Sequence, residues 1–181
     1  SLLYDFSGSS YHYNTDFSVG GRIAQIVSPA SVTISKAFAP RAIQPGGMST
    51  MTFKLTNPTS ETFTGVHFAD TLLGGLVVAG SPTPTYSDCG AGTFSPAPSP
   101  LDTELSFSGA TLAPNSVCTI TVDVGGPAGT YPNTTSNLFV NGSTDTGNFG
   151  QDTLTSSSAP PCVAGQTLAT WTVPDGTTAN P

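Results

Sequence analysis

The segment Val32–Phe38 has the sequence VTISKAF, in which alternate residues are mostly apolar. Side chains of a β-strand point alternately to its two faces, so these apolar residues share one face. The same alternation recurs in Met51–Leu55, and a third strong strand signal runs through Val117–Val124. The three segments predict strands that each bury one face.

The composition agrees with an all-β protein. Only 8% of the 181 residues are charged, against about 25% in a typical soluble protein. Prolines recur along the chain and no long Ala/Glu/Lys/Leu-rich periodic segment occurs, which excludes long helices. The hydrophobic content of 36% is enough to build a core. No apolar run approaches the roughly 18 residues that span a bilayer.

Strand signals follow one another about every ten residues, separated by Pro, Gly, Asn and Ser. About seven strands over roughly 110 residues is the size of an immunoglobulin-like β-sandwich, which is the predicted fold. The expected strands lie at 32–38, 51–56, 63–72, 76–79, 104–107, 117–124 and 131–140.

Two segments flank the predicted sandwich, which we assign to residues 31–141. Residues 1–30 form an N-terminal extension with strands, and residues 142–181 form a Gly/Ser/Thr-rich linker with a C-terminal strand. The flanks either add strands to the same sheets or pair with a neighbouring subunit. We interpret the chain, which starts without Met, as a processed piece of a longer precursor. The residues expected in inter-subunit strands are Leu2, Tyr4, Phe6, Leu168, Thr170 and Trp171.

The charge balance excludes two classes of partner. The formal net charge is −7, with four Lys and Arg residues in total. Nucleic-acid binding needs a cationic face, and an anionic membrane surface is disfavoured for the same reason. A surface rich in hydroxyls and poor in charge associates readily, which favours an extracellular wall, fibre or assembly.

Several strings, taken in order, resemble a bacterial surface repeat. They are SKAFAP (35–40), IQPGG (43–47), TFKLTNP (52–58), FADTL (68–72), GLVVA (75–79) and CTITVDV (118–124). The family is a conserved repeat domain of unknown function from large secreted and outer-surface proteins, and the similarity covers about residues 32–141. The resemblance implies an immunoglobulin-like sandwich, often in tandem, with a structural or adhesive role and no catalytic residue.

The resembling repeats also carry a cysteine pair where this chain has Cys89 and Cys118, which implies a disulfide. Closing a loop of about 30 residues would stabilise the fold by roughly 3–4 kcal/mol. Two reduced core thiols are the alternative, and they fit poorly with an exported chain. Cys162 is then left as a free thiol or as a link to another chain.

Two ions fall on faces that the alternation predicts to be buried. Lys36 shares a face with Ile34 and Phe38, and Asp70 shares one with Phe68. An unpaired buried charge costs several kcal/mol, so we expect Lys36 and Asp70 to pair. An amide of the last predicted strand, at Asn133 or Asn137, can approach this pair.

This combination resembles the intramolecular isopeptide sites of Gram-positive pilins. In those sites a buried lysine with a lowered pKa attacks the amide carbon, the carboxyl group carries protons, and ammonia leaves. The alternatives are a plain buried ion pair, or strand ends at which both groups reach water.

Nothing else in the sequence favours catalysis, so we predict no enzyme, no cofactor and no metal. The chain has two histidines, His12 and His67, to which no acidic partner can be assigned, and it lacks a Gly-x-Ser-x-Gly elbow. The segment Asn141–Asp152 is rich in oxygen donors that suit Ca²⁺. It lacks the order of acids of an EF-hand, and we interpret it as a polar loop.

The resulting prediction is an extracellular structural subunit or module of a bacterial surface filament or stalk. Copies would join head to tail by strand complementation, in a polymer or a tandem array. The alternative is an adhesin-type binding module for carbohydrate or host protein.

Overall fold

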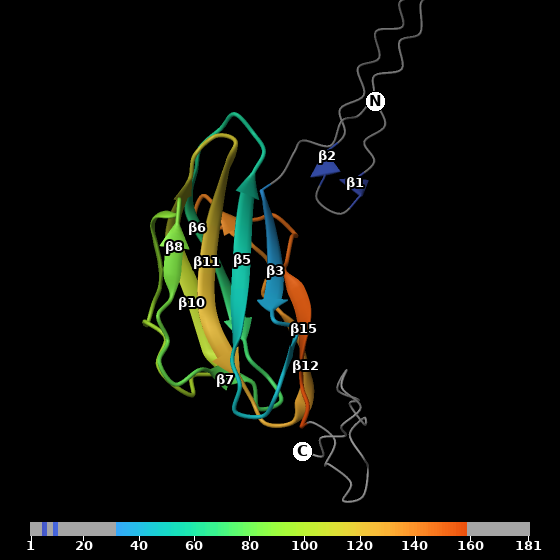
Figure 1. The fold of residues 1–181 in the computed structure, drawn as a ribbon. Coiled ribbons are helices and arrows are strands. Elements are labelled where there is room, and N and C mark those ends of the chain that lie inside the picture. The colour runs from blue at the N-terminus through green and yellow to red at the C-terminus, as the bar shows by residue number, and fades with distance from the viewer. Residues whose placement is uncertain (1–4, 7–8, 11–31, 159–181) are drawn as a thin grey trace, which may run out of the picture.

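The computed structural model describes residues 5–6, 9–10 and 32–158, and these residues form strands without any helix (Figure 1). The seven longest strands carry the fold. They are β3 (Thr33–Ala39), β5 (Ser49–Asn57), β6 (Phe63–Thr71), β10 (Glu104–Leu112), β11 (Ser116–Gly125), β12 (Gly129–Thr134) and β15 (Gln151–Ser156).

One layer of the sandwich has the strand order β3-β5-β11-β7, where β7 is Val77–Val78. The strand β8 (Thr85–Ser87) also pairs with β11. All of these pairs are antiparallel, and the register places Lys36 opposite Phe53. Alternate residues of β3 are buried, as the sequence pattern predicts.

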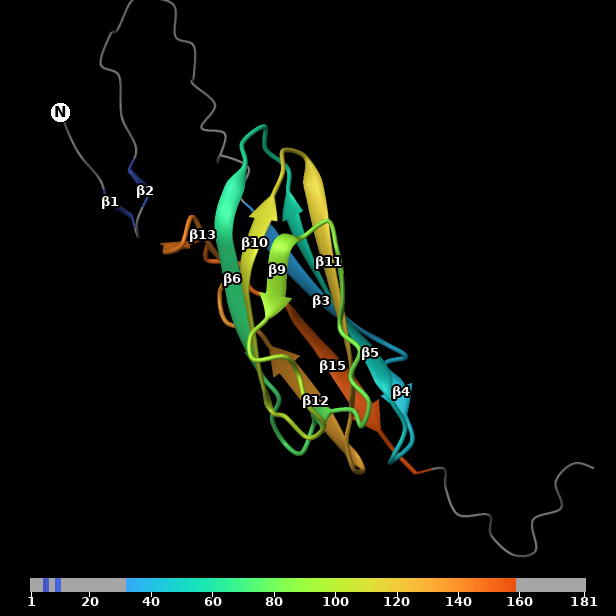
Figure 2. The same cartoon turned by 90° about the vertical axis from the view of Figure 1, so that its left-hand side faces the viewer.

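The second layer has the order β14-β13-β6-β10-β9. Its shorter members are β9 (Gly90–Phe94), β13 (Phe139–Val140) and β14 (Thr144–Asp145). Figure 2 shows β6, β10 and β9 in front of the layer that contains β5 and β11.

A third, smaller sheet closes one side of the sandwich. It has the order β12-β15-β4, where β4 is Ala42–Ile43, and the pairing of β15 with β4 is its parallel contact. Both views show β15 running beside β3 (Figures 1 and 2). The first and last strands of the sandwich are therefore neighbours.

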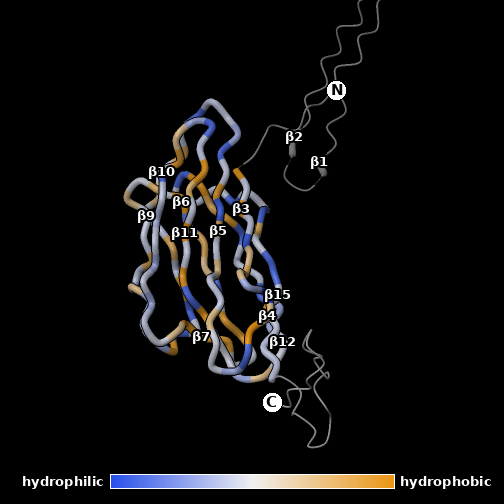
Figure 3. Tube along the Cα trace, in the orientation of Figure 1, coloured by the Kyte–Doolittle hydropathy of each residue, from blue (hydrophilic) through white to orange (hydrophobic). Residues whose placement is uncertain are grey.

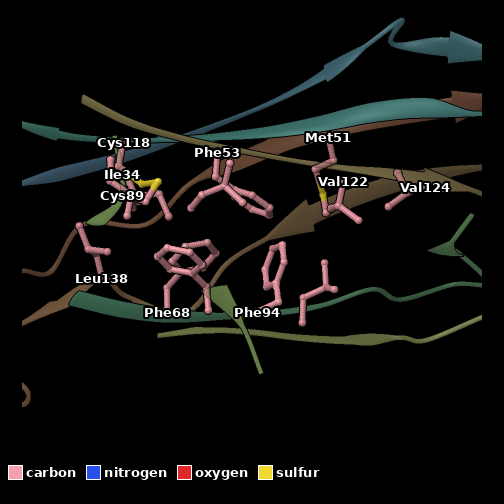
Figure 4. Packing of buried hydrophobic residues seen from close by; sticks show 14 of the residues in the cluster. Ile34, Met51, Phe53, Phe68, Cys89, Phe94, Cys118, Val122, Val124 and Leu138 are labelled. Atoms are coloured by element: carbon pink, nitrogen blue, oxygen red, sulfur yellow. A yellow bond between two sulfur atoms is a disulfide. The ribbon is translucent and has the colours of Figure 1, made fainter. Parts of the chain in front are cut away.

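The core lies between the two larger layers (Figure 4). Phe53 of β5 packs against Phe68 of β6, with ring centroids 4.9 Å apart, and Phe68 packs against Phe107 of β10 at 5.4 Å. Along the strands, apolar residues alternate with polar ones (Figure 3). The predicted fold class, an all-β immunoglobulin-like sandwich, is confirmed.

The sandwich continues beyond residue 141, where the sequence analysis places its end. The strand β15 pairs with β12 from Gly129↔Ser156 to Thr134↔Gln151 and buries Leu154 completely. This strand has one large apolar residue, so hydrophobic alternation could not reveal it. At the N-terminus, β1 (Asp5–Phe6) pairs with β2 (Ser9–Ser10).

Candidate functional site

The strand β3 directs Lys36 into the core because Ile34 and Phe38 on the same face are buried there. The side chain of Lys36 has no exposed surface. Its Nζ lies 5.2 Å from the ring centroid of Phe53 and 5.6 Å from that of Phe38. Two aromatic rings thus form the apolar wall of the site and favour a cation there.

Asp70 enters the same space from β6, and its side chain is also fully buried. Its backbone forms an isolated antiparallel bridge with Thr135, just beyond the end of β12. The carboxylate Oδ2 accepts a hydrogen bond from Lys36 Nζ. The expected pairing of the two inward-facing ions is present.

Asn133 of β12 completes the cluster. Its Nδ2 donates to Asp70 Oδ1 at 2.9 Å and to the backbone oxygen of Thr71 at 2.9 Å. Its Oδ1 accepts from Lys36 Nζ. One oxygen of the Asp70 carboxylate therefore contacts the amine, and the other contacts the amide nitrogen.

Burial lowers the pKa of Lys36, and the Asp70 carboxylate, followed by that of Asp152, opposes this effect. A lowered pKa makes the neutral amine, which is the nucleophilic form, more accessible. Every buried side-chain nitrogen and oxygen in the described residues has a hydrogen-bond partner. The cluster is therefore a complete polar network inside an apolar core.

The backbone just before β15 packs closely against β3 beside Lys36, at the seam between the two strands. Gly150 precedes β15, and a Cβ atom there would lie 3.0 Å from Lys36 Cβ and 3.2 Å from Lys36 N. Its N–H donates to Thr135 Oγ1 at 2.9 Å. The missing side chain of Gly150 allows the backbone to pack directly against the lysine.

Asp152 closes the same seam through its carboxylate. Its Oδ2 accepts from the backbone nitrogen of Phe38 at 2.8 Å and from Nε of Arg41 at 3.1 Å. Gly150 and Asp152 were not predictable from the sequence, because β15 carries too little alternation to be recognised, and without β15 the partner of Arg41 could not be identified. The one available signal was the scarcity of cations, since Arg41 is one of four Lys and Arg residues.

The two asparagines that the sequence offers as partners of Lys36 lie in different places. Asn133 lies in the cluster, whereas Nδ2 of Asn137 donates to Asp145 Oδ2 at 2.9 Å in an exposed position. The strand β12 ends at Thr134, so its alternation does not continue to Asn137. The structure therefore brings together Lys36, Asp70 and Asn133 and leaves Asn137 outside.

The other predicted residues have the following positions. Cys89 and Cys118 form a disulfide within the buried core. His67 stacks on Phe139 with centroids 5.0 Å apart, and its Nδ1 lies 3.1 Å from the backbone oxygen of Gly65. Phe6 belongs to β1. The remaining predicted positions lie outside the described residues: Leu2, Tyr4, His12, Cys162, Leu168, Thr170 and Trp171.

Other kinds of site have little support in the described residues. Within 32–158 and the two short N-terminal strands, no three His, Cys, Asp or Glu side chains are grouped to hold a metal ion. The same residues contain no helix long and apolar enough to cross a membrane. In the segment expected to be a polar loop, Asp145 accepts from the backbone nitrogen of Gly147 at 2.8 Å.

Among the solved structures similar to this chain are bacterial adhesin and pilin proteins and a protein that catalyses macrocyclization. A collagen-binding domain from a Staphylococcus aureus adhesin matches with 9% identity and a TM-score of 0.48, over 70% of this chain and 99% of that one. The pilus backbone of Streptococcus pneumoniae matches with 16% identity and a TM-score of 0.46, over 66% of this chain and 34% of that one. The major pilin subunit of Bacillus cereus matches with 12% identity and a TM-score of 0.44, over 68% and 38%.

No curated protein matches the chain. A family model described as a domain of unknown function, DUF7933, matches residues 32–156, which are the sandwich from the start of β3 to the end of β15. The chain belongs to this family.

Proposed function

We propose that this domain is a structural module of a bacterial surface stalk or filament, and that it cross-links itself through an isopeptide bond between Lys36 and Asn133. The observation that carries the proposal is the position of the buried Asp70 carboxylate, which contacts both the amine and the amide nitrogen. A plain ion pair would not need an amide held in this orientation.

Lys36, Asp70 and Asn133 supply all the atoms and protons that the cross-linking reaction needs. With the proton on Asp70, the neutral amine of Lys36 attacks Cγ of Asn133 and the Nζ–Cγ bond forms. Asp70 passes its proton to the amide nitrogen and takes one from the attacking nitrogen, so it acts as acid and as base. The Cγ–Nδ2 bond breaks, and the nitrogen leaves as ammonia. The carbonyl oxygen of Thr71 holds the departing nitrogen in place through its hydrogen bond.

Because the cluster is buried, the cross-link would be formed for the protein's own structure and not on an external substrate. The side chains of Lys36 and Asp70 have no exposed surface, and Asn133 is 4% exposed. No external substrate can reach the reacting atoms, so the reaction would occur once, within the chain. We therefore propose a domain that modifies itself and is not an enzyme in the usual sense.

Intact mass spectrometry of the folded chain tests the bond. After reduction of the disulfide, the wild-type protein is expected to be lighter than its sequence by one ammonia, and Lys36→Met, Asp70→Asn and Asn133→Ala variants are expected to have full mass. Asn137→Ala is the matched control, because it removes an exposed amide and should still lose one ammonia. A folded wild-type chain of full mass would overturn the proposal.

A second measurement excludes another source of the same mass loss. Asn141 is followed by Gly142, and an Asn-Gly step can lose ammonia by forming a succinimide. Digestion and fragmentation should therefore locate a peptide that contains both Lys36 and Asn133. A mass loss confined to the peptide around Asn141 would count against the cross-link.

For assembly, we propose that the terminal segments complete the sheets of neighbouring copies, which gives a head-to-tail polymer. The candidate strands are around Leu2–Phe6 and Thr167–Val173, of which Asp5 and Phe6 are described. Electron microscopy of the natively isolated protein should show regular fibres that dissolve to monomers on a denaturing gel. Monomers that persist at all concentrations would contradict this mode of assembly.

A further inference from the structure

An ion pair lies at the seam between the strand that carries Lys36 and the sheet that carries Asn133. Asp152 of β15 is the register partner of Asn133 in β12. The same side chain binds the backbone nitrogen of Phe38, two residues after Lys36, and Nε of Arg41. Asp152 thus connects the two reacting strands, since its backbone pairs with β12 and its carboxylate binds the end of β3.

The two members of this pair differ in their exposure to solvent. The side chain of Asp152 is 11% exposed, whereas that of Arg41 is 70% exposed. Although burial opposes ionisation of Asp152, hydrogen bonds from Phe38 and Thr153 and the charge of Arg41 lower its pKa. A negative charge is therefore held beside the β3 strand at neutral pH.

Few other charges act on the lysine. From β6 the charged neighbour of Lys36 is Asp70, and from β15 it is Asp152. The strand β5 carries Lys54, but its side chain is exposed on the opposite face. The strand β12 carries Tyr131, whose hydroxyl donates a hydrogen bond to the backbone oxygen of Pro127 at 2.5 Å. The electrostatic potential at the Lys36 amine is therefore set by the carboxylates of Asp70 and Asp152 and by the cations that neutralise these carboxylates.

We propose that the Arg41–Asp152 pair is a positioning element that sets the rate and the pH window of the Lys36–Asn133 cross-linking reaction. This inference rests on the proposed isopeptide bond. Asp152 aligns β15 with β3 through the Phe38 N–H, and Arg41 neutralises the charge that this alignment brings close to the amine.

The physical reason lies in the proton that Lys36 and Asp70 share. The reactive arrangement has a neutral amine and a protonated carboxyl group, and it is a tautomer of the ion pair. The rate is therefore highest where the two groups hold one proton together, and it falls on both sides of that window. Additional negative potential at the amine retains protons and moves the window to higher pH.

The test follows cross-linking during refolding of the full-length chain. Chain isolated from inclusion bodies in denaturant, with a mass that shows no cross-link, is diluted into buffers over a range of pH. Samples are quenched in acid and denaturant, and the fraction lighter by one ammonia is measured with time. Tyrosine fluorescence of the unquenched refolding mixture reports folding separately.

Opposite shifts are expected from the two halves of the pair. Arg41→Gln should move the window up by about 0.3–0.6 pH units, so that the reaction slows about two- to fourfold on the low-pH side of the window. Asp152→Asn keeps an oxygen acceptor for Phe38 N and should move the window down. Arg41→Lys should restore the wild-type window.

Lys54→Gln is the matched control, because it removes an exposed cation that lies on the outer face of the neighbouring strand, and it should leave the window unchanged. Shifts of the same sign in Arg41→Gln and Asp152→Asn, or no shift in either, would overturn the inference while leaving the cross-link intact. A wild-type chain that folds without losing ammonia would overturn both proposals.

Discussion

At the scale of single residues, the buried amine of Lys36 controls the chemistry of the core. Lys36 and Asp70 are the charged residues that the described part of the chain buries. Their positions were predictable, because strict alternation in β3 and in Val66–Leu72 places both side chains inward. The choice between Asn133 and Asn137 was not predictable, because the sequence pattern does not show where β12 ends.

The lowered pKa of Lys36 leads to a pH-dependent stability that cross-linking should remove. In an Asn133→Ala variant the amine remains titratable. Between its lowered folded-state pKa and the ordinary value of 10.5, the unfolded chain binds more protons than the folded one. The free energy of unfolding of this variant should therefore rise with pH through that window and level off above it.

Denaturant unfolding at a series of pH values measures this effect. The wild-type chain, whose Lys36 nitrogen is then an amide, should lack this contribution. Equal pH slopes for the two proteins would contradict the proposed difference between them.

At the scale of elements, the seam between β3 and β15 depends on the absence of a side chain at Gly150. A Gly150→Ala substitution would place a methyl group 3.0 Å from Lys36 Cβ, so the backbone must move. We expect a loss of about 1–3 kcal/mol in unfolding free energy, typical of overpacking, and slower cross-linking. Thermal or denaturant unfolding combined with the refolding assay measures both.

Gly80→Ala provides the control for this substitution, because a Cβ atom at Gly80 meets nothing within 4 Å and its φ is not positive. It should change neither stability nor cross-linking appreciably. If Gly150→Ala behaved like Gly80→Ala, the seam would be more tolerant than its packing indicates.

The seam between β3 and β15 is the part of the fold that the sequence did not predict. The long strands β5 and β11 bury apolar residues at alternate positions and were readily recognised. The strand β15 buries Leu154 and Ser156 and leaves polar residues elsewhere, so its place in the sheet depends on pairing with β12 and β4. Backbone pairing over long sequence separations has no local signature, so Asp152, and with it the ion pair that it forms with Arg41, could not be predicted.

At the scale of the whole molecule, the cross-link would constrain the unfolded chain. Lys36 and Asn133 are 97 positions apart, and closing a loop of that size contributes about 4–5 kcal/mol in the chain-entropy model. Compared with Asp70→Asn, the wild type should unfold at a higher denaturant concentration. It should also show a smaller m-value, because its unfolded state exposes less surface.

Denaturant titrations of the two proteins, with the disulfide intact in both, provide the measurement. A wild-type m-value equal to that of Asp70→Asn would indicate that the unfolded chains are equally open. The proposed covalent closure would then be absent, whatever the difference in midpoint.

The joining of Lys36 to Asn133 would also change how the molecule responds to damage. The backbone between these residues becomes a closed ring, and the Cys89–Cys118 bond divides it with a smaller loop. Protease cleavage at any one point of the ring, including the proline-rich turn at 95–100, opens it without releasing a fragment. Only a cut outside the ring separates the chain that enters the sandwich from the chain that leaves it. A stalk of such modules would therefore stay continuous after nicks that would sever an ordinary polypeptide.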